Sequence, residues 1–389
     1  MLKVLHVASF FGNIGDNANH KGTKVILEKE LGTQICFTNL EIRKAYQNYI
    51  GHDKLYFDEK FVQLANNHDL VIIGGGNFFD IWVESSSTGT TIDMSIETLR
   101  KIRVPIIFHG LGCDCDPHFG APPHLVKKFK SFIDAALTSN NCLVSVRNDG
   151  SIGTIKKYLG PQYAKKIYHI PDGGFFAKSN KYYHPELPSQ KSRIIGVNIA
   201  IDMKSHRFKM INSNSIDYIQ FIKKLSDVLT DKLNQIDNLH IVFIPHVYSD
   251  LEAISDLLLQ MNDHLRRNRV TVAPYVQGDL GQDYILDLYN NCDLILGMRF
   301  HANVCPIGLN VPTIGLVSYP QIEDLYDELG LLDRKIHINV SGFEKELGEK
   351  IYYSLENEYN IRHKYSVIVD KLDDDLHSFH STIKKKFFS

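Results

Sequence analysis

The chain has 389 residues, which is long for a single hydrophobic core, so we expect two domains. Hydrophobic residues make up 43% of the chain and charged residues 23%, as in an ordinary globular protein. The formal net charge of −2 excludes a global field that would attract nucleic acid or an acidic membrane, so any basic site must be local.

The N-terminal segment, residues 1–17, has one lysine before a short apolar run that breaks at Gly12. This run is too short and too interrupted for a signal peptide or a membrane-spanning helix, so we expect a first buried strand in a cytoplasmic protein. The six scattered cysteines are then expected to be reduced. Cys113 and Cys115 form one C-x-C pair without a second ligand pair, which is a poor zinc signature, and no metal is expected.

Short apolar runs rich in valine and isoleucine recur along the chain and predict strands that are covered on both faces, as in a parallel sheet. The segments between them have an apolar spacing of three and four, which predicts helices, and the alternation indicates an α/β fold. Nine runs of this kind occupy residues 3–8, 70–76, 104–112, 142–147, 193–200, 240–246, 269–274, 292–300 and 311–317.

A polar segment at residues 175–193 has two prolines and neither a helical nor a strand period, which predicts a linker. We expect two doubly wound, Rossmann-like domains that face a cleft, an N-terminal one over residues 1–180 and a C-terminal one over residues 190–340. Residues 341–389 are expected to form a helical segment that packs back on the first domain.

In such sheets ligands bind beyond the carboxyl ends of the strands, so the residues after each run are candidates for a site. After the first run, Gly12 and Gly15 permit a tight turn, and Asp16 or Asn17 could cap the next helix. The N-terminus of that helix would suit an anion, but a capped turn without a ligand explains these residues equally well.

The second run ends in three glycines, which let the backbone approach a ligand or another segment of chain closely. Three side chains that could offer hydrogen bonds and a stacking face to a ligand follow these glycines. A tight backbone crossing without a ligand is the main alternative. The candidates here are Gly75, Gly76, Asn77, Asp80 and Trp82.

Three later runs end in cationic or imidazole side chains. His109 ends one run, where it is either a structural group or a catalytic one. Arg147 ends another, and because a buried guanidinium is costly unless paired, we expect it to meet Asp172 or an anionic ligand. His246, with Asp250 nearby, is either a ligand contact or part of an ordinary capped loop.

Arg299 and His301 lie between a buried run and a helix that contains Pro306. Proline is tolerated in the first turn of a helix but not further in, so we expect the helix to begin near residues 302–303 and residues 299–301 to be extended. In an extended chain residues two apart share a side, so the arginine and the histidine would point the same way at the helix N-terminus. This arrangement predicts an anion site with proton donors.

Taken in order, these motifs resemble the polysaccharide pyruvyl transferase family. The resemblance rests on GNIGDNA, GGGNFFD, HGLG, SVRNDGS, IPDGGFF, IPHVYSD and GMRFHANVCPIGLNVPTIGLVSYPQIEDLYDELGL, which run from residue 12 to about 332. It implies a fold similar to the two-domain B-type glycosyltransferases, with the acceptor on the N-terminal side. It also implies transfer of the pyruvyl group of phosphoenolpyruvate to two hydroxyls of a sugar in a polysaccharide or glycan precursor, as a cyclic ketal, with release of phosphate.

Carried over position by position, Arg147, Arg299 and His301 match the family's proposed active-site residues, and His109 is a further match. The expected roles are that the arginines hold the oxyanions of phosphoenolpyruvate and that His301 protonates its methylene carbon, with His109 as base or second acid. Tyr319, in the tyrosine-containing loop of the last motif, is an expected substrate contact.

The resemblance implies no cofactor beyond phosphoenolpyruvate as co-substrate, no nucleic-acid partner, and membrane association only through a lipid-linked acceptor. Three alternatives stay open. One is a nucleotide-sugar-dependent glycosyltransferase of the same fold, and another is a non-catalytic family member, which departures from the family at Asn148 and Gln321 would suit. The last is a metal hydrolase that uses His109, Asp114, Asp116 and His118.

Overall fold

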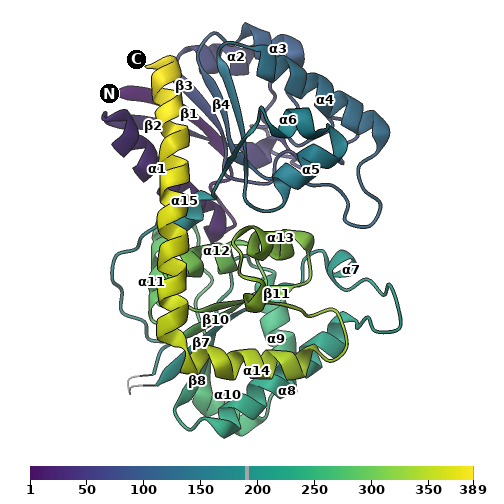
Figure 1. Cartoon of the computed structure of the whole chain (residues 1–389), viewed down its shortest axis with the longest axis vertical. Helices are drawn as coiled ribbons and strands as arrows, with labels where there is room; N and C mark the ends of the chain where they lie inside the picture. The colour runs from purple at the N-terminus through teal and green to yellow at the C-terminus, as the bar shows by residue number, and fades with distance from the viewer. Residues whose placement is uncertain (189–191, 389) are drawn as a thin grey trace. The chain divides into compact units, whose positions relative to one another are not determined.

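The computed structural model describes residues 1–188 and 192–388, and its chain divides into two compact units. Unit 1 comprises Met1–Phe11, Thr23–Gly173 and the chain from Leu372, and unit 2 comprises Gly12–Gly22 and Gly174–Lys371. Each unit has its own six-stranded sheet flanked by helices, which confirms the predicted α/β fold (Figure 1).

The sheet of unit 1 is parallel throughout and has the order β2-β1-β3-β4-β5-β6. Its strands are β1 (Leu2–Ala8), β2 (Ile35–Glu41), β3 (Leu70–Gly74), β4 (Ile106–Leu111), β5 (Cys142–Arg147) and β6 (Tyr168–Ile170). The helical segments between them are α1 (Ile14–Leu31), η1 (Ile42–Ala45), α2 (Glu59–Asn66), α3 (Ile96–Lys101), α4 (Pro123–Thr138), α5 (Ser151–Tyr158) and α6 (Pro161–Ala164).

The sheet of unit 2 is also parallel and has the order β12-β11-β10-β7-β8-β9, so the direction of winding reverses between β7 and β10. Its strands are β7 (Arg193–Asn198), β8 (Leu239–Phe243), β9 (Val270–Val272), β10 (Leu294–Gly297), β11 (Thr313–Val317) and β12 (Lys335–His337). Its helical segments are η2 (Gly173–Phe176), α7 (Lys204–Arg207), α8 (Tyr218–Gln235), α9 (Asp250–Gln260), α10 (Asp263–Arg269), α11 (Gly278–Asn290), α12 (His301–Gly308), α13 (Pro320–Glu328), η3 (Leu332–Arg334), α14 (Phe343–Glu356) and α15 (Glu358–Phe387), the last of which continues into unit 1.

The helices bury one apolar stripe each against the sheets. In α4 the buried residues recur at helical spacing, and Phe129 and Phe132 meet Phe79 and Phe108 at ring centroid distances of 5.1 and 5.6 Å. Helix α8 begins with a capping box, in which the carboxylate of Asp217 accepts the backbone N–H of Gln220 and the Gln220 side chain accepts the backbone N–H of Asp217. Local signals and side-chain packing therefore agree on where these helices form.

The predicted domain limits differ from the two units. Residues 12–22, expected in the N-terminal domain, group with unit 2. The predicted linker at 175–193 also groups with unit 2, where the backbone N–H of Tyr182 and the ring of His184 bond to Asp287 at 2.8 and 3.0 Å. Residues 189–191 of that linker, and residue 389 of the predicted C-terminal segment, lie outside the described residues.

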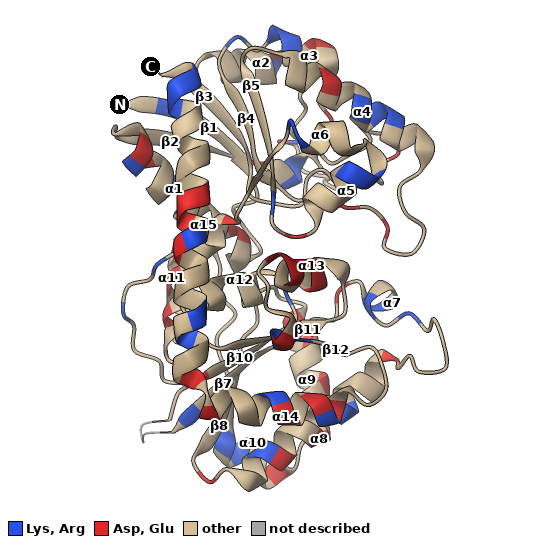
Figure 2. Cartoon of the chain, in the orientation of Figure 1, with Lys and Arg blue, Asp and Glu red and all other residues tan. Residues whose placement is uncertain are grey.

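Charged side chains of both signs are interspersed along both units, for example on α15, as expected from a net charge of −2 (Figure 2). None of the helices in the described chain combines the length and the apolar character needed to cross a bilayer. A charged ligand would therefore be attracted by local clusters of charge and not by a general field of the protein.

Candidate functional site

In unit 2 the candidate site lies where the strand order reverses, which is where doubly wound sheets bind ligands. Asn198 ends β7, and its side-chain oxygen accepts the backbone N–H of Arg299, just past β10, at 3.0 Å. The same amide donates to the carbonyl of Ile244, just past β8, at 2.9 Å. One buried asparagine therefore ties the carboxyl ends of three strands together.

Helix α12 begins at His301, and Phe300 before it already has helical angles, φ −52° and ψ −54°. The prediction of an extended segment before a helix start near residues 302–303 is therefore wrong, and so is the argument from it that Arg299 and His301 share a side. Pro306 lies inside the helix. The amide of Asn303 makes this start stable, because it donates to the carbonyls of Gly297 and Arg299 at 3.0 and 2.8 Å. Tertiary packing of an almost wholly buried helix outweighs the lost proline N–H bond.

The guanidinium of Arg299 is held by two carboxylates. Its Nε donates to both oxygens of Asp250 at 2.9 and 2.8 Å, and Nη2 donates to Asp202 at 2.8 Å. Burial opposes the charge, but the two carboxylates raise the pKa of Arg299, whose charge in turn lowers the pKa of Asp202. The Asp250 side chain is fully buried and that of Asp202 is 38% exposed, so only Asp202 can exchange readily with a ligand.

His301 is buried against the first turn of α1. A Cβ atom on Gly15 would lie 2.5 Å from three atoms of His301, so only glycine permits this contact. Burial, and then the charges of Arg299 and His301, lower the pKa of His246 far below its ordinary range. The structure thus brings together Arg299, His301 and His246, three of the predicted residues.

Sequence reasoning missed Asp202 and Arg207, which follow β7. The guanidinium of Arg207 donates to Ser318 Oγ at 3.1 Å and lies 5.7 Å from the centroid of Tyr319. Tyr319, a predicted substrate contact, is buried beneath it. The missed signal was an acidic residue shortly after a buried strand, in the segment IDMKSHR.

Asp16 and Asn17 do not cap α1. The helix begins at Ile14, so both residues lie inside its first turn, and Asn13 Oδ1 accepts the backbone N–H of Gly15 at 3.0 Å. The side chain of Asn17 donates to Asp279 at 3.3 Å. The residue that caps α1 is therefore Asn13, which precedes Asp16 and Asn17 in the same motif.

In unit 1, Arg147 ends β5 and is neutralised by the protein. Its Nε donates to Asp149 at 2.6 Å and its Nη1 to Asp172 at 3.3 Å, which confirms the predicted partner Asp172. Asn148 Oδ1 accepts the backbone N–H of Asp172 at 3.0 Å. The family departure at Asn148 therefore has a structural role, because it places the carboxylate that pairs with Arg147.

His109 lies at the end of β4, but its ring faces the last part of α15 instead of an open pocket. Its Nε2 and that of His380 are 2.8 Å apart, and the ring of Phe379 packs on it at 5.6 Å. Burial lowers the pKa of His109 to about 4, and burial also lowers that of His380, so a neutral donor meets a neutral acceptor. These contacts argue against the predicted catalytic role and favour a packing role.

Gly75 and Gly76 form the tight crossing between β3 and β4. Gly75 has φ 81° and its N–H donates to the carbonyl of His109 at 3.3 Å, while the carbonyl of Gly76 accepts the N–H of Gly112 at 2.9 Å. A Cβ atom on Gly76 would lie 2.4 Å from the ring of Phe78. The two glycines serve the backbone, and neither lines the pocket described next.

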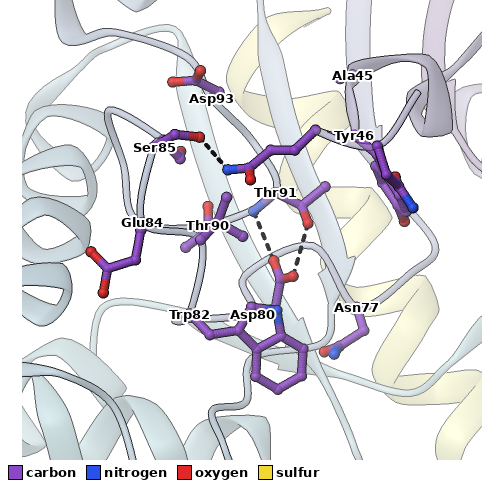
Figure 3. A pocket seen from close by; sticks show the side chains of 14 residues that line it. Ala45, Tyr46, Asn77, Asp80, Trp82, Glu84, Ser85, Thr90, Thr91 and Asp93 are labelled. Carbon is purple, nitrogen blue, oxygen red and sulfur yellow. Dashed lines mark hydrogen bonds between the residues drawn. The ribbon is translucent and has the colours of Figure 1, made fainter. Parts of the chain in front are cut away.

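Beyond the ends of β2 and β3, unit 1 contains a pocket of about 670 Å³ (Figure 3). Three of the predicted candidates, Asn77, Asp80 and Trp82, line it. The remaining lining residues come from the turn after η1 and from the loop that follows Trp82. They are Ala45, Tyr46, Gln47, Asn48, Val83, Glu84, Ser85, Ser86, Thr90, Thr91 and Asp93.

The described part of the chain contains no group of three histidine, cysteine, aspartate or glutamate side chains arranged to hold a metal ion. Asp116, one of the candidate ligands of the metal-hydrolase alternative, accepts the backbone N–H groups of His118 and Phe119 at 2.8 and 2.9 Å. These bonds are those of an ordinary aspartate turn.

A family model described as polysaccharide pyruvyl transferase matches residues 13–319 of the chain. A search of curated proteins found no match. Among solved structures, a glycosyltransferase from Rickettsia africae ESF-5 is 13% identical with a TM-score of 0.55, covering 100% of this chain and 99% of that one. UDP-GlcNAc 2-epimerase from Methanocaldococcus jannaschii is 11% identical with a TM-score of 0.52, covering 91% and 93%. At these identities the two structures share the fold alone.

Proposed function

Because this chain belongs to the polysaccharide pyruvyl transferase family, we propose that it transfers the pyruvyl group of phosphoenolpyruvate to two hydroxyls of one sugar. The product is a cyclic ketal on a polysaccharide or glycan precursor, and phosphate is released. The observation that supports the proposal best is His301, held by Gly15 beside Arg299 at the point where the strand order of unit 2 reverses.

In the first half of the reaction, His301 donates a proton to the methylene carbon of phosphoenolpyruvate. The adjacent carbon becomes oxocarbenium-like, and the first sugar hydroxyl attacks it. The proton of that hydroxyl returns to the imidazole of His301. The result is a ketal that still carries the phosphate group, and His301 is ready for another turnover.

In the second half, the carbon–oxygen bond to phosphate breaks, and the second hydroxyl of the same sugar attacks the same carbon. Its proton leaves with the phosphate, so the sum of phosphoenolpyruvate and a diol equals the cyclic ketal and phosphate. This sequence needs no second protein base, which agrees with the burial of His109 beneath α15.

Phosphoenolpyruvate carries a carboxylate and a phosphate, and Arg299 is the cation of the unit 2 site that can bind one of them. We propose that this anion replaces the half-exposed carboxylate of Asp202, while buried Asp250 keeps the guanidinium in place. The exchange preserves the local charge balance, which matters because an unpaired buried charge is costly.

The test is phosphate release from phosphoenolpyruvate with and without an acceptor. Candidate acceptors are galactosides, glucosides and mannosamine-containing lipid intermediates. We expect acceptor-dependent release, together with a gain in acceptor mass equal to pyruvic acid minus one water. In His301→Gln and His301→Ala, turnover should fall by at least about 10²-fold because the proton donor is lost.

The matched control is His337→Ala, which removes a half-exposed histidine of unit 2 and should keep full turnover. Circular dichroism spectra and melting temperatures should establish that each variant is folded. The proposal fails if no acceptor gives release and phosphoenolpyruvate does not raise the melting temperature. A rise with UDP or GDP instead, with turnover of a nucleotide sugar, would establish the glycosyltransferase alternative.

A further inference from the structure

The lining of the unit 1 pocket includes two aromatic side chains, Tyr46 and Trp82, and Trp82 is the larger. Trp82 lines the pocket and is 37% exposed, and its ring lies next to Asp80 (Figure 3). The backbone N–H of Trp82 donates to the backbone carbonyl of Asp80 at 2.9 Å, and the indole stabilises the charged form of the buried Asp80 carboxylate. An indole fixed in this way offers a flat apolar face with a preset orientation.

Asp80 also fixes the opposite wall. Its two carboxylate oxygens accept the backbone N–H and the hydroxyl of Thr91 at 2.7 and 2.8 Å. Across the pocket, the carbonyls of Glu84 and Ser86 accept from Lys128 of α4 at 2.9 and 3.0 Å. The loop that encloses the pocket is therefore held at several points, so the pocket is preformed.

The charge of the lining selects the class of ligand. Among the described residues that line the pocket, none is lysine, arginine or histidine, and three carry carboxylates: Asp80, Glu84 and Asp93. The cations nearest to this lining, Lys128 and His124, are already bonded to Glu84 and Ser86, so a phosphate, a carboxylate or a diphosphate would meet like charge from the lining side chains. The other polar lining groups are amides, hydroxyls and a phenol, which pair with neutral hydroxyl groups.

We propose that this pocket binds an uncharged sugar unit of the acceptor, with its apolar face on Trp82 and its hydroxyls on the polar wall. Identifying the ligand as part of an acceptor rests on the proposed function. The volume of about 670 Å³ lies within the range of small-molecule pockets and is large enough for more than one sugar ring. The pocket binds the acceptor, and phosphoenolpyruvate binds elsewhere.

Trp82 is the only tryptophan of the chain, so tryptophan fluorescence reports on this pocket alone. The probes are neutral disaccharides of galactose, glucose and mannose, set against glucuronate, galactose 1-phosphate and phosphoenolpyruvate. We expect at least one neutral disaccharide to change the emission saturably, and each anion to bind at least about tenfold more weakly. Calorimetric binding to Trp82→Ala should be lost, and binding to Trp82→Phe should be largely kept.

A charge variant tests whether the negative charge of the lining is what excludes anionic ligands. Glu84→Lys places a cation at the pocket and should remove the discrimination against the anionic probes. Glu97→Lys on α3 makes the same charge change at another exposed position, away from the pocket, and should bind the probes as the wild-type protein does.

The proposal is overturned if no neutral disaccharide changes the emission, or if an anion binds as tightly as the best neutral ligand. It is also overturned if Trp82→Ala keeps the wild-type KM for an active acceptor. The two binding results do not depend on turnover, and only the KM comparison does. Saccharide binding without phosphate release would refute pyruvyl transfer but leave the pocket assignment intact, whereas release with an unchanged KM in Trp82→Ala would refute only the pocket.

Discussion

At the scale of single residues, Gly15 matters because it has no side chain. His301 fills the place where a Cβ atom of any other residue would be, at a distance of 2.5 Å. The position of the imidazole, the proposed proton donor, therefore depends on the absence of a side chain at Gly15. The glycine is helical, so its role is close approach and not an unusual backbone angle.

Replacing Gly15 by alanine should therefore displace His301 and lower pyruvyl transfer by about 10²-fold, the effect of misplacing a catalytic group by about 1 Å. Gly153→Ala is the matched control, because Gly153 is also helical but has open space at its Cβ position. That change should keep activity and stabilise the protein by up to about 1 kcal/mol. Full activity of Gly15→Ala in a phosphate-release assay would contradict the role given to this contact.

At the scale of elements, every inner strand of the two sheets was predicted, whereas three of the four edge strands were not and only the edge strand β9 was. All nine apolar runs are strands, but β2, β6 and β12 were missed. Each of these three is an edge strand with partly exposed positions, such as the alternating exposure of β2. Because a continuous apolar run arises only where both faces are covered, the pattern identifies inner strands.

The buried carboxyl of Asp80 should make the unfolding free energy of the protein depend on pH. Burial raises the pKa of Asp80 to about 6, so the folded state favours the protonated form. This contribution is complete below the ordinary pKa near 3.8 and is lost as the pH rises through about 6. Relative to Asp80→Asn, whose amide does not titrate, the wild-type protein should lose up to about 3 kcal/mol of unfolding free energy between pH 4 and pH 7.

Urea unfolding of both proteins across this range measures the difference. Titrating groups that do not interact with Asp80, such as buried His109, are present in both proteins and cancel, whereas Asp114, whose pKa the charge of Asp80 helps to raise, adds a coupled contribution to the difference. A constant difference between the two curves would show that Asp80 ionises in the folded state as it does in the unfolded chain.

At the scale of the whole molecule, α15 completes a unit that begins at the other end of the chain. Beyond Leu372, its buried residues include Phe379, whose ring lies 5.6 Å from His109 and 5.1 Å from Tyr168, both in unit 1. In unit 2, the buried Phe343 of α14 packs on Phe221 at 5.9 Å. Each unit therefore has a core that can be weakened separately.

Phe379→Ala and Phe343→Ala should each cost about 3–5 kcal/mol, but in different units. Because the single tryptophan lies in unit 1, its emission follows the unfolding of that unit, whereas circular dichroism follows both. Phe379→Ala should lower the midpoint of the tryptophan transition. Phe343→Ala should leave that midpoint unchanged and lower only the midpoint of the dichroism transition that belongs to unit 2. Equal shifts of the tryptophan midpoint in both variants would mean that the units unfold as one.

The sequence by itself determined the α/β class, the inner strands and the family, because apolar periodicity and motif order are local along the chain. It also placed Arg299, His301 and His246 at strand ends, where the structure brings them together. Tertiary structure alone decided the partners of these groups. The carboxylates on Arg299, the helical start at His301 and the burial of His109 under α15 arise from contacts between segments far apart in sequence, which no local pattern encodes.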